Sequence, residues 1–389
     1  MASIRKRFVT NPKTKKRTVS WQVDYRDLKK KRRHRQFATR READAWLVTA
    51  RSEIAEGTHV PAGESPTFKE AADAWIKDCK RNGLEKTTVD VYEQRMRDYS
   101  VPLIGDRKIG ELTVADANTL YEDVLEKSLS RETVRRVRIE VGAVLRYAQR
   151  KGWVVKNVIS LAPYKHGKRN KKRPPMPRLE EVRSMIDTTT ENWTDWLAML
   201  FVLVFCGLRG SELRALCWSD VDLKNNRMSV TRRADRWGNI GSPKSDAGTR
   251  DIVFPKIVAK ALKEWKLRCP KSDYGLVFPT STGTVQNHSN IMNRWLRLVQ
   301  IEAGVCNRKV IVDKDGTKTV KLVAKYGMHA LRHFCASVWI EADFSPKRIQ
   351  TMMGHASIDL TFDTYGYLFE ARMDVEKATQ RTQSIVLAS

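Results

Sequence analysis

The sequence has few cysteines, and their spacing excludes the usual cysteine-based sites. Among 389 residues there are six cysteines, and no two of them form a CxxC pair. Neither a zinc site nor a disulfide framework is therefore indicated. Several lie in apolar runs, which is typical of reduced, buried cysteines in a cytosolic protein. The six are Cys79, Cys206, Cys217, Cys269, Cys306 and Cys335.

Long apolar segments are also missing. The longest apolar run, residues 197–206, is about half as long as the ~20 residues that a membrane-spanning helix needs. The N-terminal segment MASIRKRFVTNPK has no apolar core of the kind found in signal peptides. We therefore expect a soluble, intracellular protein.

Acidic residues are scarce relative to basic ones. The chain has 72 Lys and Arg against 45 Asp and Glu, which gives a formal net charge of +27. Such a charge predicts a polyanionic partner, and nucleic acid is the first candidate. A ribosome-associated or simply basic protein is the alternative. The length predicts two or three domains.

The residues that could carry chemistry gather in the C-terminal half. HALRH and MGHASIDLTFDTY lie within residues 329–365, and GLRGSEL and SPKSDAGTR lie upstream. Guanidinium groups bind phosphate oxygens bidentately and stay charged. A tyrosine, with an ordinary pKa of about 10, becomes a nucleophile when a base or a positive field assists it. A lysine or histidine can protonate the leaving oxygen. The set therefore suits metal-free attack on a phosphodiester.

The residues Arg, Lys, His-x-x-Arg, His and Tyr follow one another in this order, each within one of these motifs. This arrangement resembles that of the tyrosine recombinases. The resemblance is to the phage and integrative-element integrases similar to lambda integrase, and it is strong over the C-terminal half and looser over the N-terminal half. It implies an enzyme that cuts one DNA strand per site through a 3′-phosphotyrosine intermediate. Four protomers would then exchange strands through a Holliday junction, integrating or excising a phage or mobile element. No metal or nucleotide cofactor is implied.

The resemblance also implies roles for individual residues. Arg209 and Arg332 resemble the two arginines that clamp the phosphate. Lys244 resembles the hairpin lysine that acts as general acid. His329 and His355 resemble the two active-site histidines that bind the phosphate and assist proton transfer.

Four further side chains belong to the same comparison. Tyr365, within Asp363-Thr-Tyr-Gly, aligns with the family nucleophile, and Tyr367 is a rival two residues later. We expect Glu212 to orient or buttress its neighbours. We expect His333 to be structural and to face the core side of its helix.

The predicted fold is mainly α with small β-sheets (α+β) in three domains. Residues 1–57 contain 17 Lys and Arg against 6 Asp and Glu, and combine three strand-like segments with a helix capped by Thr39 and Glu42. They resemble the arm-type DNA-binding domain of integrases. Residues 66–162 are periodically helical and resemble a helical core-binding domain. Residues 175–389 resemble the mixed α/β catalytic domain with its C-terminal tail.

Basic residues outside the catalytic set are candidate DNA contacts, although for a single arginine a solvated helix face is an alternative. The candidates are Arg32, Arg33, Arg35, Arg135, Arg138, Lys168 and Arg169. The last two lie in a tether rich in proline and lysine, residues 163–177. A turn at Asp315-Gly316 predicts a hairpin between residues 310 and 323, to which we assign no function.

The expected partners are double-stranded DNA, at core-type and arm-type attachment sites, and further copies of the chain in a homotetramer. The sequence leaves open whether an excisionase or a DNA-bending host protein is required. The resemblance implies a place on the nucleoid in a bacterial cytoplasm. Two alternatives stay open: a non-catalytic DNA-binding protein on the same fold, and a type IB-like topoisomerase. The basic N-terminal module and the integrase-like motifs argue against the topoisomerase.

Overall fold

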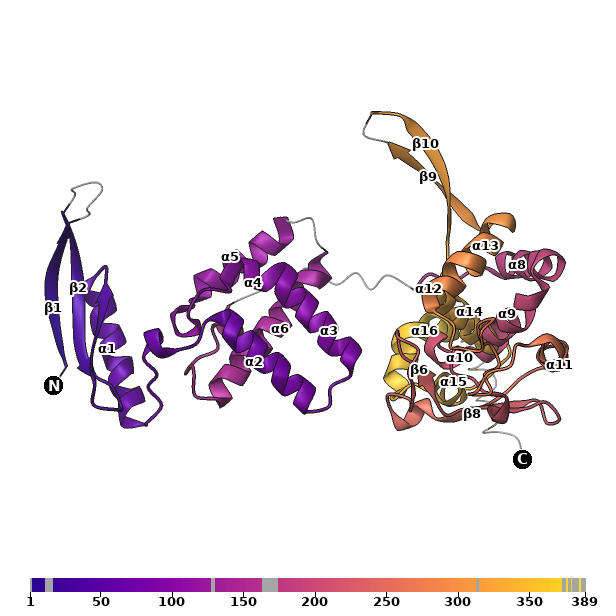
Figure 1. Ribbon diagram of the computed structural model, residues 1–389, viewed down its shortest axis with the longest axis horizontal. Helices are drawn as coiled ribbons and strands as arrows, with labels where there is room; N and C mark the ends of the chain where they lie inside the picture. The colour runs from indigo at the N-terminus through magenta and orange to yellow at the C-terminus, as the bar shows by residue number, and fades with distance from the viewer. Residues whose placement is uncertain are drawn as a thin grey trace. The chain divides into compact units, whose positions relative to one another are not determined.

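The computed structural model describes residues 2–10, 17–126, 130–162, 174–312 and 315–372, together with positions 376, 379 and 385. The chain divides into two compact units, Met1–Arg169 and Asn170–Ser389 (Figure 1). Lys168, Arg169 and most of the tail beyond residue 372 lie outside the described residues. No helix in the described ranges is long and apolar enough to cross a membrane.

The first unit begins with a three-stranded antiparallel sheet, which confirms the strands predicted there. The strands β1 (Ser3–Thr10), β2 (Arg17–Arg26) and β3 (Arg32–Phe37) pair in sequence order. Helix α1 (Arg40–Ala55) packs on one face of the sheet, where Val23, Ala43 and Leu47 are buried. Thr39 and Glu42 form the reciprocal capping box that starts α1, as the sequence predicts.

A helical module follows in the same unit. Its helices are α2 (Phe68–Arg81), α3 (Lys86–Arg95), α4 (Val101–Ile104), α5 (Val114–Glu126), α6 (Arg131–Arg150) and α7 (Val158–Leu161), with a π-helical turn Met96–Ser100 and 3-10 turns Ala62–Glu64 and Ile109–Glu111. Ser130 caps α6 through the Thr133 amide. The apolar stripe of α6, including Val137 and Val141, packs against Phe68 and Leu120 in one core.

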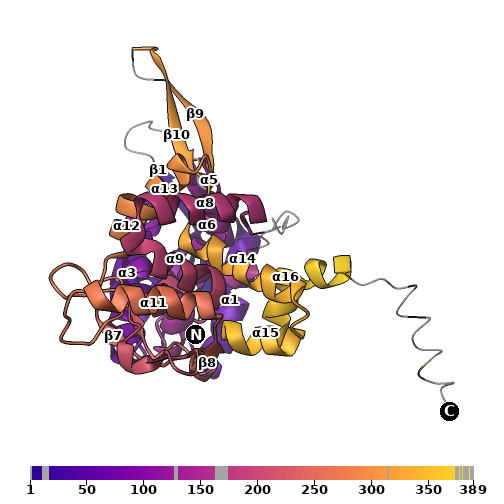
Figure 2. The same ribbon diagram turned by 90° about the vertical axis from the view of Figure 1, so that its right-hand side faces the viewer.

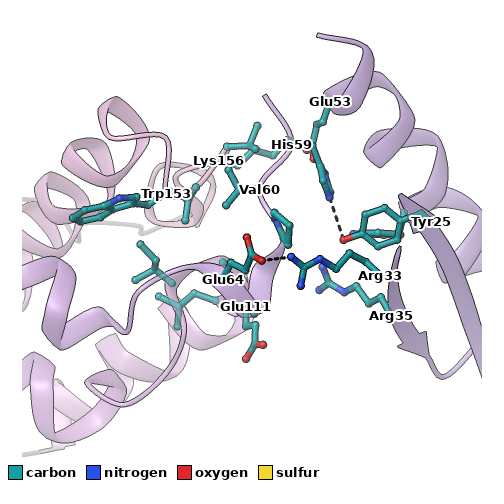
Figure 3. A pocket seen from close by; sticks show the side chains of 18 of the residues that line it. Tyr25, Arg33, Arg35, Glu53, His59, Val60, Glu64, Glu111, Trp153 and Lys156 are labelled. Carbon is teal, nitrogen blue, oxygen red and sulfur yellow. Dashed lines mark hydrogen bonds and ion pairs between the residues drawn. The ribbon is translucent and has the colours of Figure 1, made fainter. Parts of the chain in front are cut away.

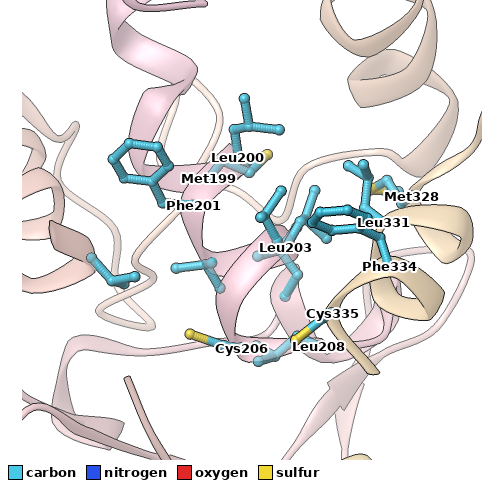
Figure 4. Close-up of a cluster of buried hydrophobic side chains, with 14 of the residues drawn as sticks. Met199, Leu200, Phe201, Leu203, Cys206, Leu208, Met328, Leu331, Phe334 and Cys335 are labelled. Atoms are coloured by element: carbon cyan, nitrogen blue, oxygen red, sulfur yellow. The ribbon is translucent and has the colours of Figure 1, made fainter. Parts of the chain in front are cut away.

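The second unit is built around a helix that is buried on every side. Helix α9 (Thr194–Cys206) is apolar from Trp196 to its end, and residues Ala198–Val204 are at most 5% exposed. Helices α8 (Leu179–Asn192), α11 (Lys256–Arg268) and α14 (Met328–Glu341) pack against it. Figure 4 shows side chains of α9, such as Leu203, in the same buried cluster as Leu331 and Cys335 of α14. Residues that begin and follow α14 are thereby fixed to the core of the unit.

Further helices, turns and strands complete the described part of the second unit. They are α10 (Gly210–Leu213), α12 (His288–Ile291), α13 (Arg297–Glu302), α15 (Pro346–Met353), α16 (Ile358–Arg372), a π-helical turn Met292–Leu296, and 3-10 turns Trp218–Asp220 and Asp246–Gly248. Strands β4 (Val221–Asp222), β5 (Arg227–Val230) and β8 (Arg250–Val253) form one sheet, and β6 (Arg233–Ala234) pairs with β7 (Ile240–Gly241).

The predicted hairpin before α14 is confirmed and is longer than expected. Strands β9 (Cys306–Val312) and β10 (Lys318–Ala324) pair antiparallel. Figures 1 and 2 show this ribbon projecting from the rest of its unit. The register places Val310, Val312, Val320 and Leu322 on one face, and all four are more than 40% exposed.

One buried carboxyl in the helical module is expected to make its stability depend on pH. Glu140 of α6 is 3% exposed and pairs with Arg95, while its Oε2 atom has no hydrogen-bond partner among the described residues. Burial raises the pKa of Glu140 to about 7, and the charge of Arg95 only partly opposes this. The folded module therefore keeps a proton that the unfolded chain releases, so stability falls as pH rises between the ordinary and the raised pKa.

We predict that α6 is less stable at pH 8 than at pH 5.5 by roughly 1–3 kcal/mol, and that Glu140→Gln removes most of this difference. The measurement is amide hydrogen exchange of α6 peptides in the full chain, corrected for intrinsic exchange rates. Glu122→Gln, at an exposed position of α5, is the matched control and should keep the wild-type pH dependence. An unaltered pH dependence in Glu140→Gln would contradict the prediction.

Candidate active site

The two arginines predicted to bind phosphate converge on one turn of the second unit. Arg332 of α14 donates from Nη1 to the Gly207 carbonyl at 2.5 Å and from Nη2 to the Met353 carbonyl. Arg209, just before α10, donates from Nη2 to the Gly354 carbonyl at 2.8 Å. Arg332 is 1% exposed, whereas the side chain of Arg209 is 34% exposed. Neighbouring carbonyls therefore fix the orientation of both guanidinium groups.

Local backbone geometry explains how Arg209 reaches this turn. Gly207 ends α9 with a left-handed φ of 59°, a conformation that glycine adopts without strain. The chain reverses there, and α10 begins directly after Arg209. Glu212 closes this turn, because its carboxylate accepts from the backbone amide of Arg209 at 2.8 Å.

Glu212 is also the common acceptor for the surrounding arginines. It accepts from Arg209 Nη1 at 2.6 Å and from Arg250 Nη1 and Nη2 at 3.1 and 2.9 Å, and Arg332 Nη1 lies 3.9 Å away. Burial opposes its charge, but the hydrogen bonds and charge of Arg250, with the charges of Arg209 and Arg332, lower the pKa of Glu212 to about 2. Glu212 is therefore ionised and holds the cations in place, in line with the orienting role expected of it.

Arg250 is a member of this cluster that the sequence prediction misses. It is the last residue of SPKSDAGTR, is 6% exposed, and donates from Nε to the Met352 carbonyl at 2.6 Å. Residues two apart in a strand share one face, so Arg250 of β8 lies on the same buried face as Ile252. This spacing was the signal that could have placed Arg250 inside.

Tyr365 lies inside the site. It is 1% exposed, and its Oη is 2.7 Å from Nδ1 of His333. The His355 ring is nearly parallel to the tyrosine ring, with centroids 6.4 Å apart and an angle of 11°. Burial raises the pKa of Tyr365 far above its ordinary value, although the charge of Arg332 opposes this. The phenol is therefore protonated in this state.

Three histidines around the phenol are neutral at pH 7. Burial, with the charges of Arg332 and Arg209, lowers the pKa of His355 to about 4, and its Nδ1 lies 2.9 Å from Oγ1 of Thr361. Burial, His329 and Arg332 lower the pKa of His333 to about 4. The pKa of His329 is also lowered, chiefly by burial.

The expectation that His333 is structural and faces the core stays a prediction. The structure shows that His333 is half-buried and bonded to the hydroxyl of Tyr365. Its ring also makes an edge contact with that of His329, with centroids 4.6 Å apart. The signal was present in the sequence, because residues four apart share one face of a helix.

Lys244 and Tyr367 take different positions in the same unit. Lys244 is exposed in the loop between β7 and β8. We call Arg209, Arg332 and the turn at residues 353–354 the clamp. The far end of the Lys244 loop lies against it, since a Cβ at Gly354 would lie 2.8 Å from the Ala247 carbonyl oxygen. Tyr367 follows Tyr365 by two residues, about 200° around α16, and the hydrogen bond to His333 is made by Tyr365.

The N-terminal sheet separates the three arginines predicted to contact DNA. Arg33 and Arg35 lie opposite Tyr25 and Val23 in the register, so they share the face that carries α1. Arg33 pairs with Asp27 at 2.9 Å and with Glu64, and Arg35 stacks over the rings of Phe37 and Trp46. Arg33 and Arg35 line a cleft of about 760 Å³. Figure 3 shows both arginines in this cleft, together with the hydrogen bond between His59 and Tyr25.

Arg32 alone of the three lies on the opposite face of this sheet. The register places Arg26, His34, Arg5 and Arg7 on that same face, and all five side chains are exposed. We call this set the open face. Extending the period-two pattern of β2 to β1 would have indicated Arg5 and Arg7.

The two candidates on α6 also differ. Arg135 pairs with Glu132 at 3.1 Å and is partly exposed. Arg138 donates from Nη2 to the Ala162 carbonyl at 3.1 Å, and its guanidinium lies over the ring of Tyr121. Arg138 is therefore engaged in holding the segment after α7.

We predict that Glu212→Gln destabilises the second unit by about 3–5 kcal/mol, because it leaves buried guanidinium groups without their counter-charge. Since the pKa of Glu212 is lowered to about 2, its contribution is present above the ordinary pKa of a glutamate and is lost progressively as pH falls from there towards about 2. Thermal unfolding at pH 7 and pH 3 measures both effects. Glu264→Gln, at an exposed glutamate of α11, is the control; equal melting temperatures for the two variants would refute the prediction.

Comparison with protein families matches residues 178–372 to the phage integrase family and residues 68–162 to the phage integrase central domain. The prophage integrase IntR of Escherichia coli K12 is 25% identical over 339 residues, covering 80% of this chain and 79% of that protein. A XerC-like tyrosine recombinase of Caldanaerobacter subterraneus is 23% identical over 370 residues, covering 85% and 86%.

Two solved structures share the fold. The Tn1549 transposon integrase in complex with a circular intermediate DNA has a TM-score of 0.64 at 20% identity, covering 82% of this chain and 99% of that one. A lambda integrase tetramer bound to a Holliday junction has a TM-score of 0.55 at 16% identity, covering 87% and 91%. With the family match across the site described above, the chain belongs to the phage integrase family, as a tyrosine recombinase of the integrase type.

Proposed function

We propose that the chain is a site-specific DNA recombinase that integrates or excises a phage or mobile element through a covalent 3′-phosphotyrosine. One observation carries the proposal. In one chain, Tyr365 contacts His333 and His355, and the charge of Arg332 acts on its phenol, next to the turn held by Arg209. A phenol that is enclosed by neutral histidines and arginines suits phosphoryl transfer, because the cations can stabilise the charge that develops on phosphate oxygens.

In the proposed reaction, Tyr365 attacks the scissile phosphate while Arg209, Arg332, His329 and His355 hold its non-bridging oxygens. The bond to the 5′-oxygen breaks, and Lys244 protonates this oxygen. Its exposed loop lets Lys244 approach a bound duplex, and the contact of Ala247 with Gly354 keeps that loop against the clamp. Rejoining reverses these steps, since the phosphotyrosine conserves the bond energy.

The described state is closed to a phosphate. Arg332 and Tyr365 are each 1% exposed, so a DNA backbone cannot touch both at once. The carbonyls of Met353 and Gly354 accept hydrogen bonds from the arginines. We propose that this turn and the start of α16 move when DNA binds, which exposes the clamp together with the nucleophile.

We further propose three modules: an arm-type domain (1–57), a core-binding domain (66–162) and a catalytic domain (175–389). The arm-type domain would contact DNA through its open face, and four protomers would assemble on core sites in a bacterial cytoplasm. Lys168 and Arg169 stay predicted DNA contacts, and an excisionase or a DNA-bending protein stays an optional partner. The binding-only alternative is not favoured, because no member of the catalytic set is lost from the sequence.

The experiment that tests the function uses a nicked suicide substrate in EDTA. Wild type and Tyr367→Phe should form a covalent protein–DNA band on a denaturing gel, and Tyr365→Phe should form none. Loss of the band in Tyr367→Phe alone would identify Tyr367, and not Tyr365, as the nucleophile. If no protein formed an adduct on its own attachment site, the binding-only alternative would replace this proposal.

The open face predicts which arginines contribute to arm-site affinity. Arg7→Ala and Arg32→Ala should each weaken binding and lower the slope of log K against log salt by about one, because each loses one phosphate contact. Fluorescence anisotropy over a salt series measures this. Arg51→Ala, at an exposed position of α1, is the control. An equal slope for Arg7→Ala, Arg32→Ala and Arg51→Ala would exclude the open face as the binding surface.

A further inference from the structure

His333 has a contact that the expected set of site residues does not explain. That set comprises two arginines, a lysine, two histidines and a tyrosine, and His333 is outside it. Yet its Nδ1 is the atom that lies 2.7 Å from the Oη of Tyr365. The His355 Nδ1, in contrast, lies against the Oγ1 of Thr361.

The surroundings of His333 determine how this hydrogen bond is polarised. The titratable and charged groups around it are His329 and Arg332 on its own helix, Tyr365 on α16, and His355 before α16. The imidazole is neutral and the phenol is protonated at pH 7. With a neutral imidazole, Nδ1 can accept from the hydroxyl when the other ring nitrogen, Nε2, carries the proton. The phenolic proton then points at His333.

We propose that His333 is the general base of the reaction and takes the proton of Tyr365 as the phenol attacks phosphate. This inference rests on the proposed function. The Oη–H bond breaks while the Oη–P bond forms, and the proton passes to Nδ1 of His333. The bond from phosphorus to the 5′-oxygen breaks, and that oxygen takes its proton from Lys244. During rejoining the imidazolium returns its proton to the departing phenolate, so the cycle closes without a co-reactant.

Charge explains why the transfer would wait for DNA. The charge of Arg332 acts on His333, and a second cation beside it is unfavourable while the site contains protein alone. A bound phosphate adds negative charge that grows during attack, and this charge stabilises an imidazolium. The phenol consequently stays protonated and unreactive until a phosphate is in place.

The test compares His333→Asn with wild type in single-turnover cleavage of the suicide substrate. The Oδ1 of asparagine can take the place of Nδ1, so the variant keeps an acceptor for the hydroxyl but cannot take the proton. We expect cleavage to fall by ~100-fold or more at pH 7. The remaining rate should rise about tenfold per pH unit up to pH 9, more steeply than in wild type, because hydroxide must remove the proton. Ser337→Ala, one turn further along α14, is the control and should match wild type.

A substrate with a sulfur in place of the bridging 5′-oxygen distinguishes the loss of a general base from the loss of a general acid. A thiolate leaves without a proton, so this substrate should restore cleavage by Lys244→Ala but not by His333→Asn. Gel-shift binding to core-site DNA confirms that each variant is folded. The proposal is overturned if His333→Asn keeps the wild-type rate and pH profile, or if the sulfur substrate rescues it. Absence of any adduct from wild type would overturn the proposed function, and this inference with it.

Discussion

The site depends on one buried carboxylate surrounded by guanidinium groups. Glu212 binds Arg209 and Arg250 and lies within 3.9 Å of Arg332, and it thereby links the turn after α9, strand β8 and helix α14. A carboxylate removed from water is unfavourable unless its charge is matched, and here several cations match it. Because those cations are like-charged, they could not be packed together without Glu212. One anion thus permits the positive field that a phosphate requires.

The turn at residues 353–354 is the second part of this arrangement. Its carbonyls accept from Arg332 and Arg209, and Gly354 adopts a left-handed φ of 63° against the Ala247 carbonyl. These contacts join the clamp to the end of the Lys244 loop and to His355. A displacement of this turn would therefore alter both arginines and the loop that carries Lys244 together.

Burial both shields the phenol of Tyr365 and keeps it protonated. Tyr365 is almost fully enclosed, which raises its pKa, and the burial of His333 lowers the basicity of its partner. A reactive phenolate in the absence of DNA would be of no use to a recombinase and could attack other electrophiles. The neutral pair therefore suits an enzyme whose chemistry must await an ordered complex.

The sequence by itself determined the secondary-structure elements and the motifs that contain the candidate site residues. Apolar periodicity and capping residues act over a few positions, so the strands, α1, α6, the buried α9 and the β9–β10 hairpin could be predicted. Tertiary structure alone decided which side chains meet. The hydrogen bond of His333 with Tyr365 spans 32 positions, the Arg250–Glu212 pair spans 38, and the Arg209–Gly354 contact spans 145. The side of the sheet on which Arg33 and Arg35 lie was decided in the same way, by the packing of α1. Such contacts follow from how helices and strands pack, and no local rule contains that information.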